Sequence, residues 1–214
     1  MASFSDNFER ADNIDLGANW TPQVAGRDCQ IVGGAVEPIG AGSRNEEQYT
    51  ATTPGADQFA QITIKAIGST TVDTACGVLN RAAATGTETF YVARAVLNAS
   101  GNHTDLGKRV AGAFTSLAGE TAITWAANDT LKLTSSGTNF VVYRNSASVV
   151  TLGSESSIAA GGTGVYSFAS PQSESQIGDF SGGDLFDATT ALAPMTNEAL
   201  SSAMIGRACR GVYG

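Results

Sequence analysis

The sequence predicts an all-β protein, a two-sheet antiparallel sandwich over residues 1–187 with a short C-terminal extension at residues 188–214. Several short segments alternate apolar and polar residues with a period of two, which places successive side chains on opposite faces of a strand. Many of the 25 glycines separate these segments where turns are needed. The charged fraction of 15% is below the roughly 25% of ordinary soluble domains, because small polar residues replace charged ones.

The clearest alternation lies in residues 59–65, which place two isoleucines on one face, and in residues 129–134, which do the same with two leucines. Two polar turns then lead into residues 140–144 and 149–152, so we expect a meander of three short strands here. The side chains expected in the core between the sheets are Phe8, Trp20, Ile62, Ile64, Val78, Leu131, Leu133, Val142 and Phe180.

Further strands follow from β-branched and aromatic content between turn residues. They are expected at residues 29–32, 48–52, 90–96, 109–114, 165–169 and 175–180. The glycine pairs 33–34, 161–162 and 182–183 are expected to form turns between strands.

The β pattern fades after residue 187, so residues 188–214 form a separate tail. Residues 196–206 predict a short helix that begins at Thr196 or Asn197 and ends at Gly206. Each large apolar side chain of the tail would cost about 1.5–3 kcal/mol to leave in water, so we expect the tail to dock on its own sandwich or on another subunit. A frayed terminus is the alternative. The residues expected to make assembly contacts are Leu200, Met204, Ile205 and Cys209.

The net charge of −8 argues against nucleic acid as a partner, because a nucleic-acid binder needs a basic face to displace counterions from phosphate. No apolar run approaches the ~20 residues of a membrane span, so we expect no membrane insertion. The first residues lack the basic and apolar stretches of a secretory leader, and we expect synthesis in the cytoplasm.

The sequence predicts no metal and no cofactor. The three cysteines, Cys29, Cys76 and Cys209, are far apart and His103 has no cysteine nearby, so a zinc site is not expected. Idle thiols are the simplest interpretation, with an intersubunit disulfide at Cys209 as the alternative. The chain has no glycine-rich loop leading into a helix of the kind that binds nucleotides.

Several phrases resemble those of the concanavalin A-like, or laminin-G-like, jelly-roll superfamily. The phrases lie at residues 6–12 with 16–21, 76–82, 128–144, 161–166 and 177–183. The resemblance covers residues 3–185 and implies a jelly-roll sandwich whose opening and closing strands pair. Relatives without secretion signals and rich in alanine, glycine, serine and threonine are frequent among tailed-bacteriophage virion proteins, and this chain looks like one of them.

The resemblance also implies which catalytic and metal sites this fold could hold. Glycosidases of the superfamily have closely spaced carboxylates on one strand, and this chain has no such phrase. Glu46 and Glu47 are expected to point to opposite faces of a strand or to lie in a solvated loop. His103 is expected in a surface loop, so we expect no enzyme. Some relatives hold calcium near Asp6 and Asp179, but ordinary strand-end carboxylates are the simpler interpretation here.

Exposed aromatic side chains could instead stack on sugar rings. The candidates are Tyr49, Tyr91, Trp125 and Tyr143, although aromatic residues are only 7% of the chain and core packing is the simpler role for each. No glycan-binding residue is assigned from the sequence.

The leading hypothesis is a non-enzymatic virion structural protein of a tailed phage, part of the capsid decoration, collar or fibre. Its partners would be other virion proteins or copies of itself. The alternative is a glycan-binding module that attaches to surface polysaccharide. A diverged glycoside hydrolase is the third hypothesis, which the missing carboxylate strand disfavours.

Overall fold

The computed structural model describes residues 2–68, 73–99, 101–121 and 123–185. Within these ranges the strands form two antiparallel sheets that pack face to face, which confirms the all-β sandwich. The helical structure in this part of the chain is limited to the 3-10 turn Gln172–Glu174. No helix among the described residues is long and apolar enough to cross a membrane.

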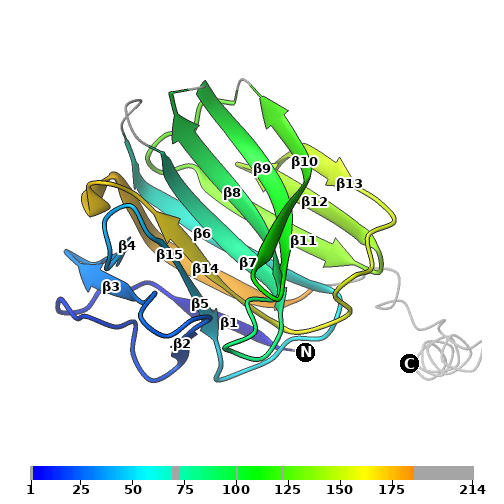
Figure 1. Ribbon diagram of the computed structural model, residues 1–214, viewed down its shortest axis with the longest axis horizontal. Coiled ribbons are helices and arrows are strands. Elements are labelled where there is room, and N and C mark those ends of the chain that lie inside the picture. The colour runs from blue at the N-terminus through cyan, green and yellow to red at the C-terminus, as the bar shows by residue number, and fades with distance from the viewer. Residues whose placement is uncertain (1, 69–72, 100, 122, 186–214) are drawn as a thin grey trace, which may run out of the picture.

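The eight-stranded sheet has the order β13 (Ala147–Leu152), β12 (Asn139–Arg144), β11 (Thr130–Ser136), β6 (Gln58–Ile67), β15 (Ser175–Asp184), β4 (Ala35–Pro38) and β3 (Cys29–Val32), with β1 (Ser3–Asp6) paired to β15. The seven-stranded sheet has the order β10 (Ala113–Thr121), β9 (Gly101–Val110), β8 (Phe90–Asn98), β7 (Thr74–Ala82), β14 (Gly162–Phe168), β5 (Arg44–Tyr49) and β2 (Trp20–Pro22). Figure 1 shows all of these strands in their sequence colours.

The first and last described strands, β1 and β15, lie side by side, as the resemblance implied (Figure 1). Phe4 lies opposite Gly182 in this pairing. The prediction that residues 182–183 form a turn is wrong, because both lie inside β15. A Cβ atom on Gly182 would lie 2.7 Å from the Thr163 hydroxyl, so glycine is needed here for close packing.

All nine side chains predicted for the core are buried, none more than 6% exposed. Phe8 and Phe180 pack against Trp20, with ring centroids 5.6 Å and 5.0 Å away. The predicted meander is also confirmed, since β11 pairs with β12 and β12 pairs with β13. The alternation of residues in these strands therefore identified both the strands and their inward faces.

Two predicted strands have different bounds in the structure. Residues 109–114 are not one strand: β9 ends at Val110, and Ala111 and Gly112 form a turn with φ of +49° and +82°. A positive φ at alanine is unusual and leaves little signal in the sequence. The strand predicted at residues 48–52 begins earlier and ends at Tyr49, because a charged stretch is buried in β5.

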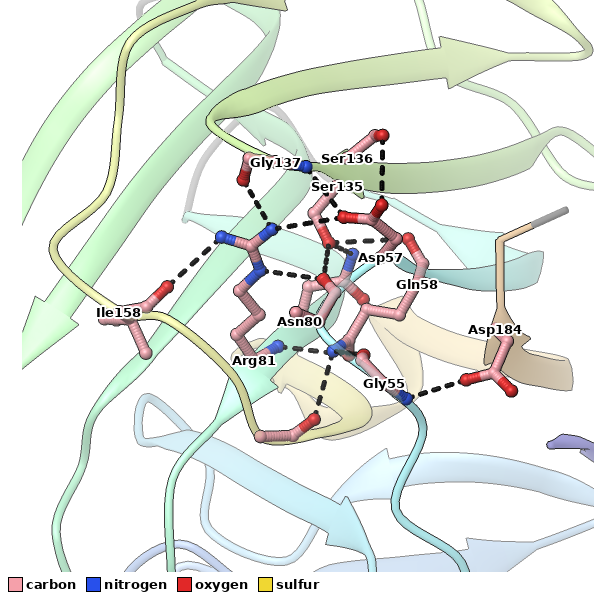
Figure 2. A network of polar contacts seen from close by, with 12 residues as sticks. Gly55, Asp57, Gln58, Asn80, Arg81, Ser135, Ser136, Gly137, Ile158 and Asp184 are labelled. Atoms are coloured by element: carbon pink, nitrogen blue, oxygen red, sulfur yellow. Dashed lines mark hydrogen bonds and ion pairs between the residues drawn. The ribbon is translucent and has the colours of Figure 1, made fainter. Parts of the chain in front are cut away.

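Arg81 holds the loops at one end of the sandwich together (Figure 2). Its guanidinium donates hydrogen bonds to the carbonyls of Ala56 at 3.0 Å, Ile158 at 3.2 Å and Gly137 at 2.6 Å. It also lies 4.0 Å from the Asp57 carboxylate. The Arg81 side chain is 3% exposed, so these contacts replace the water that its guanidinium would otherwise bind.

Cys29 and Cys76 are buried free thiols, in agreement with the simplest interpretation of the sequence. The predicted helix at residues 196–206, with the assembly residues Leu200, Met204, Ile205 and Cys209, lies outside the described residues. The division of the chain at residue 187 stays a prediction for the same reason.

Candidate functional site

The outer face of the seven-stranded sheet carries a second apolar cluster, separate from the core between the sheets. Pairing of neighbouring strands brings its side chains together: Ala75 of β7 lies opposite Val96 of β8 on one side and opposite Phe168 of β14 on the other. Its buried members are Ala75, Leu79, Ala82, Phe90, Val92, Val96 and Tyr166. Each is at most 7% exposed, so protein atoms cover much of this face.

Two loops cover part of the outer face of the seven-stranded sheet. The first joins β2 to β3 and the second joins β7 to β8. The Gly86 amide of the second loop donates to the Gln23 carbonyl of the first at 2.8 Å. The Gln23 side chain in turn donates to the Gln48 side chain of β5 at 2.8 Å. These bonds connect the loops to each other and to the sheet.

Five charged side chains strengthen this connection, and we call Arg27, Arg44, Glu46, Glu88 and Arg109 the arginine–glutamate cluster. Glu88 accepts hydrogen bonds from Arg27 at 3.0 Å and from Arg44 at 2.7 Å, and it lies 3.7 Å from Arg109. The Arg44 Nε atom is 3.1 Å from the Glu46 carboxylate. The cluster therefore joins the two loops, β5 and β9 over the face of the sheet.

The cluster also shows that this face is concave. The Arg109 Nε atom of β9 lies 3.7 Å from the Glu46 carboxylate of β5, although β8, β7 and β14 separate the two strands. Four strand spacings would amount to about 19 Å in a flat sheet, which is beyond the reach of two side chains. The twisted sheet must therefore curl toward its outer face between β5 and β9.

Glu46 and Glu47 lie on opposite faces of β5, as one interpretation of the sequence held, and the alternative of a solvated loop is wrong. Glu46 is fully buried in the arginine–glutamate cluster. Burial raises the pKa of Glu46, and Arg44 and Arg109 oppose this increase only in part. Glu46 and Glu88, from segments far apart in the sequence, share Arg44 because these segments meet on the concave face.

The Glu47 side chain points to the interior. Its carboxylate accepts a hydrogen bond from the Cys29 amide at 2.6 Å. Burial raises the pKa of Glu47 to about 8, a shift that the hydrogen bond from Cys29 opposes and that nearby Asp28 and Asp15 reinforce. Neither Glu46 nor Glu47 is exposed enough to reach a substrate.

An open pocket lies on the same outer face and extends toward the start of β7 and the end of β8. We call it the Arg94 pocket, and its volume is about 250 Å³. It is lined by Asp73, Thr74, Ala75, Arg94, Val96, Asn98, His103, Tyr166 and Phe168. The lining therefore combines aromatic rings with charged and polar side chains, the composition of a site for a small polar ligand that also has apolar faces.

Arg94 is held firmly in this pocket. Its guanidinium lies 4.7 Å from the ring centroid of Phe114 and 5.5 Å from that of Tyr166. Asp105, opposite Arg94 in the pairing of β8 with β9, forms an ion pair with it. A planar cation fixed between two rings and a carboxylate can present its remaining donors in one orientation.

The sequence did not identify this pocket. Arg94 and Tyr166 are 72 residues apart and belong to strands that are not adjacent in the sheet, so no local pattern connects them. His103 does line the pocket, but the prediction of a loop is wrong because the residue lies in β9. The turn between β8 and β9, which precedes His103, is shorter than the asparagine and glycine residues of this segment indicated.

The aromatic candidates from the sequence lie elsewhere. Tyr91 and Trp125 are buried in the core, where Tyr91 bonds Glu155 at 3.0 Å. Tyr49 is half-buried and stacks on Phe4 with ring centroids 4.4 Å apart. Tyr143 lines a separate hollow of about 280 Å³ on the outer face of the eight-stranded sheet.

Asp6 is occupied by neighbours within the protein. It accepts hydrogen bonds from the Trp20 indole at 2.9 Å and from Arg10 at 2.6 Å. Asp179 lines a different hollow together with Lys65. No group of three or more histidine, cysteine or acidic side chains that could hold a metal ion occurs among the described residues.

Comparisons with known proteins identify the fold. No protein-family model matches the chain, and no curated protein matches it in sequence. Among solved structures, the carbohydrate-binding module CBM66 from Bacillus subtilis is 14% identical with a TM-score of 0.58, and the match covers 79% of this chain and 95% of the module. At these identities the comparison establishes the shared lectin-like jelly roll.

Two further structures have the same fold. The carbohydrate recognition domain of Emp47p is 10% identical with a TM-score of 0.58, and the match covers 86% of this chain and 95% of that domain. The exoplasmic/lumenal domain of VIP36, in a form bound to Ca²⁺ and Man3GlcNAc, is 12% identical with a TM-score of 0.56, with coverage of 82% and 88%. The concanavalin A-like resemblance is thus confirmed at the level of the fold.

Proposed function

We propose that this domain binds carbohydrate, and that the Arg94 pocket is its binding site. The observation that carries the proposal is the guanidinium of Arg94, held between the rings of Phe114 and Tyr166 in an open pocket on the concave face. The lectin-like folds of the compared structures support it, and they favour the glycan-binding alternative over the virion hypothesis.

The lining of the pocket suits a sugar ring. The exposed side of Phe168 offers an apolar surface for the C–H groups of the ring. Arg94 and His103 supply nitrogen atoms and Asp73 supplies carboxylate oxygens, so hydroxyl groups of the sugar find both donors and acceptors. Because Arg94 is already fixed by Asp105 and two rings, little side-chain freedom is lost when it binds a hydroxyl pair.

The test is a glycan array, followed by calorimetry with each glycan that binds. Arg94→Ala should weaken binding by at least about tenfold, the equivalent of one charge-assisted hydrogen bond. Arg144→Ala is the matched control, since Arg144 also has an acidic partner, Asp129 at 2.8 Å, and lies 5.6 Å from the ring of Trp125. Retention of full affinity by Arg94→Ala, or absence of binding to every glycan by the unaltered protein, would contradict the proposal.

The remaining functional hypotheses stay predictions. The compared structures are carbohydrate-binding domains, which supports a non-enzymatic role, while a place in a tailed-phage virion and partners among virion proteins have no support from them. Glycan binding is compatible with a virion component, because such a module could attach a particle to surface polysaccharide. Identification of the proteins that copurify with this chain would test that part of the hypothesis.

A further inference from the structure

We propose that the Arg94 pocket receives the end of a glycan chain or a short oligosaccharide, and that Glu88 is the positioning residue that sets this limit. The inference rests on the proposed function, because it concerns the same site. The ligand would be a terminal unit rather than an internal stretch of a long polysaccharide that crosses the concave face.

A second hollow lies at the other end of these strands, among the loops that join β2 to β3, β7 to β8 and β9 to β10, and side chains lie between it and the Arg94 pocket. Arg94 of the pocket and Arg109 of the cluster lie on the same ring, 4.7 Å and 5.5 Å from the centroid of Phe114. Arg109 lies 3.7 Å from Glu88, which lines the second hollow together with Gly112. A continuous row of contacts therefore separates the Arg94 pocket from this hollow of about 540 Å³.

The charged side chains beside Phe114 in this row are mostly buried. The side chain of Glu46 has no exposed surface, that of Arg109 is 9% exposed and that of Glu88 is 14% exposed. A polysaccharide that ran along the face would have to displace these ion pairs from buried positions, which is costly for charged groups. The open end of the face at the Arg94 pocket is accessible without such a change.

The size of the Arg94 pocket agrees with this limit. Its volume of about 250 Å³ lies below the roughly 300–1,000 Å³ of pockets that enclose drug-sized molecules. One sugar ring, or two with the second partly outside, is the ligand that such a volume accommodates.

Glu88 is the centre of the cluster, because it contacts three arginines from three different segments. Arg27 comes from the loop before β3, Arg44 from β5 and Arg109 from β9. Without the Glu88 carboxylate, these three cations would keep Glu46 as their remaining acidic neighbour and would repel one another. We therefore expect Glu88→Ala to separate the arginines and to open the face between the two hollows.

The experiment uses the full chain on an array of glucans, mannans, fructans, galactans and uronans, each printed as mono-, tri- and hexasaccharides. For the series that binds, the unaltered protein should have affinities that agree within about threefold across the lengths. Glu88→Ala should keep its affinity for the monosaccharide and gain about fivefold or more for the hexasaccharide. A change that only damaged the fold would lower all affinities together, which the monosaccharide measurement detects.

Glu155→Ala is the matched control, because Glu155 also bonds a cation, Lys108 at 3.0 Å, and lies away from the concave face. The dependence of this variant's affinity on glycan length should match that of the unaltered protein.

If Glu88→Ala melts below the assay temperature, Arg27→Ala removes one cation at the edge of the cluster, and the hexasaccharide should again be favoured. Affinity of the unaltered protein that rises tenfold or more with length would overturn this inference but leave the proposed function intact. Binding to none of the series would contradict both.

Discussion

The Glu47 carboxylate accepts a 2.6 Å hydrogen bond from the Cys29 amide, and this contact joins β5 of one sheet to β3 of the other. Glu47 is 2% exposed, and burial raises its pKa to about 8 from an ordinary value of 4.5. The folded state therefore holds a proton at Glu47 that the unfolded chain releases above pH 4.5. Stability from this group is fully present below pH 4.5 and is lost as the pH rises toward 8.

Glu47→Gln should remove this dependence, because an amide keeps the acceptor for Cys29 without a charge. We expect the variant to match the unaltered protein near pH 5 and to exceed it by on the order of a few kcal/mol at pH 8 to 9. Urea denaturation at several pH values measures both. A variant that is equally destabilised at every pH would show that the carboxyl group has another role.

Arg81→Met should destabilise the fold. It leaves three carbonyls at the loop end without their donor, and each buried polar group left without a partner costs about 1–3 kcal/mol. Lys132→Met is the control, since its ammonium lies 4.9 Å from the ring of Phe59 on the outer face and should contribute within about 1 kcal/mol. Equal effects of the two substitutions in urea denaturation would contradict the assigned role of Arg81.

Leu133→Ala should lower the free energy of unfolding by about 2–5 kcal/mol, because Leu133 is fully buried between the sheets. Thr134→Ala, at the next position on the opposite face of β11, is the comparison and should cost clearly less. A loss below half a kcal/mol for Leu133 would mean that this strand does not contribute to the core.

The chain should release no reducing ends from laminarin, agarose, carrageenan or alginate. Glu46 is enclosed and Glu88 is bound by arginines, so neither carboxylate is placed to protonate or attack a glycosidic bond. Turnover that disappears in Glu46→Gln or Glu47→Gln would show that the protein is an enzyme.

Deletion of residues 188–214 should leave a folded, soluble sandwich that no longer assembles with its partner or with copies of itself. The prediction comes from the apolar content of the tail, including Leu200, Met204 and Ile205, and from Cys209. Light scattering and a melting curve on the shortened protein provide the measurement. Unchanged assembly, or loss of the sandwich itself, would show that the tail is not an anchor.

Those parts of the fold that depend on residues close together in the sequence could be predicted from the sequence. Leu131 and Leu133 alternate with polar residues, and the pleat of a strand converts that alternation into one buried and one exposed face without reference to the rest of the chain. The turn at Ala111 could not be predicted in this way, because it depends on a positive φ, and alanine gives no sequence signal for that conformation.

The sequence by itself thus determined the β architecture, the core and the pairing of the meander, since neighbouring residues decide each of these. Only the tertiary structure decided the concave face and its site. Arg94, Phe114 and Tyr166 come from three strands, and Glu46 meets Arg109 across three others. These contacts depend on the order of strands in the sheet and on its curvature, which are properties of the whole chain rather than of any segment of it.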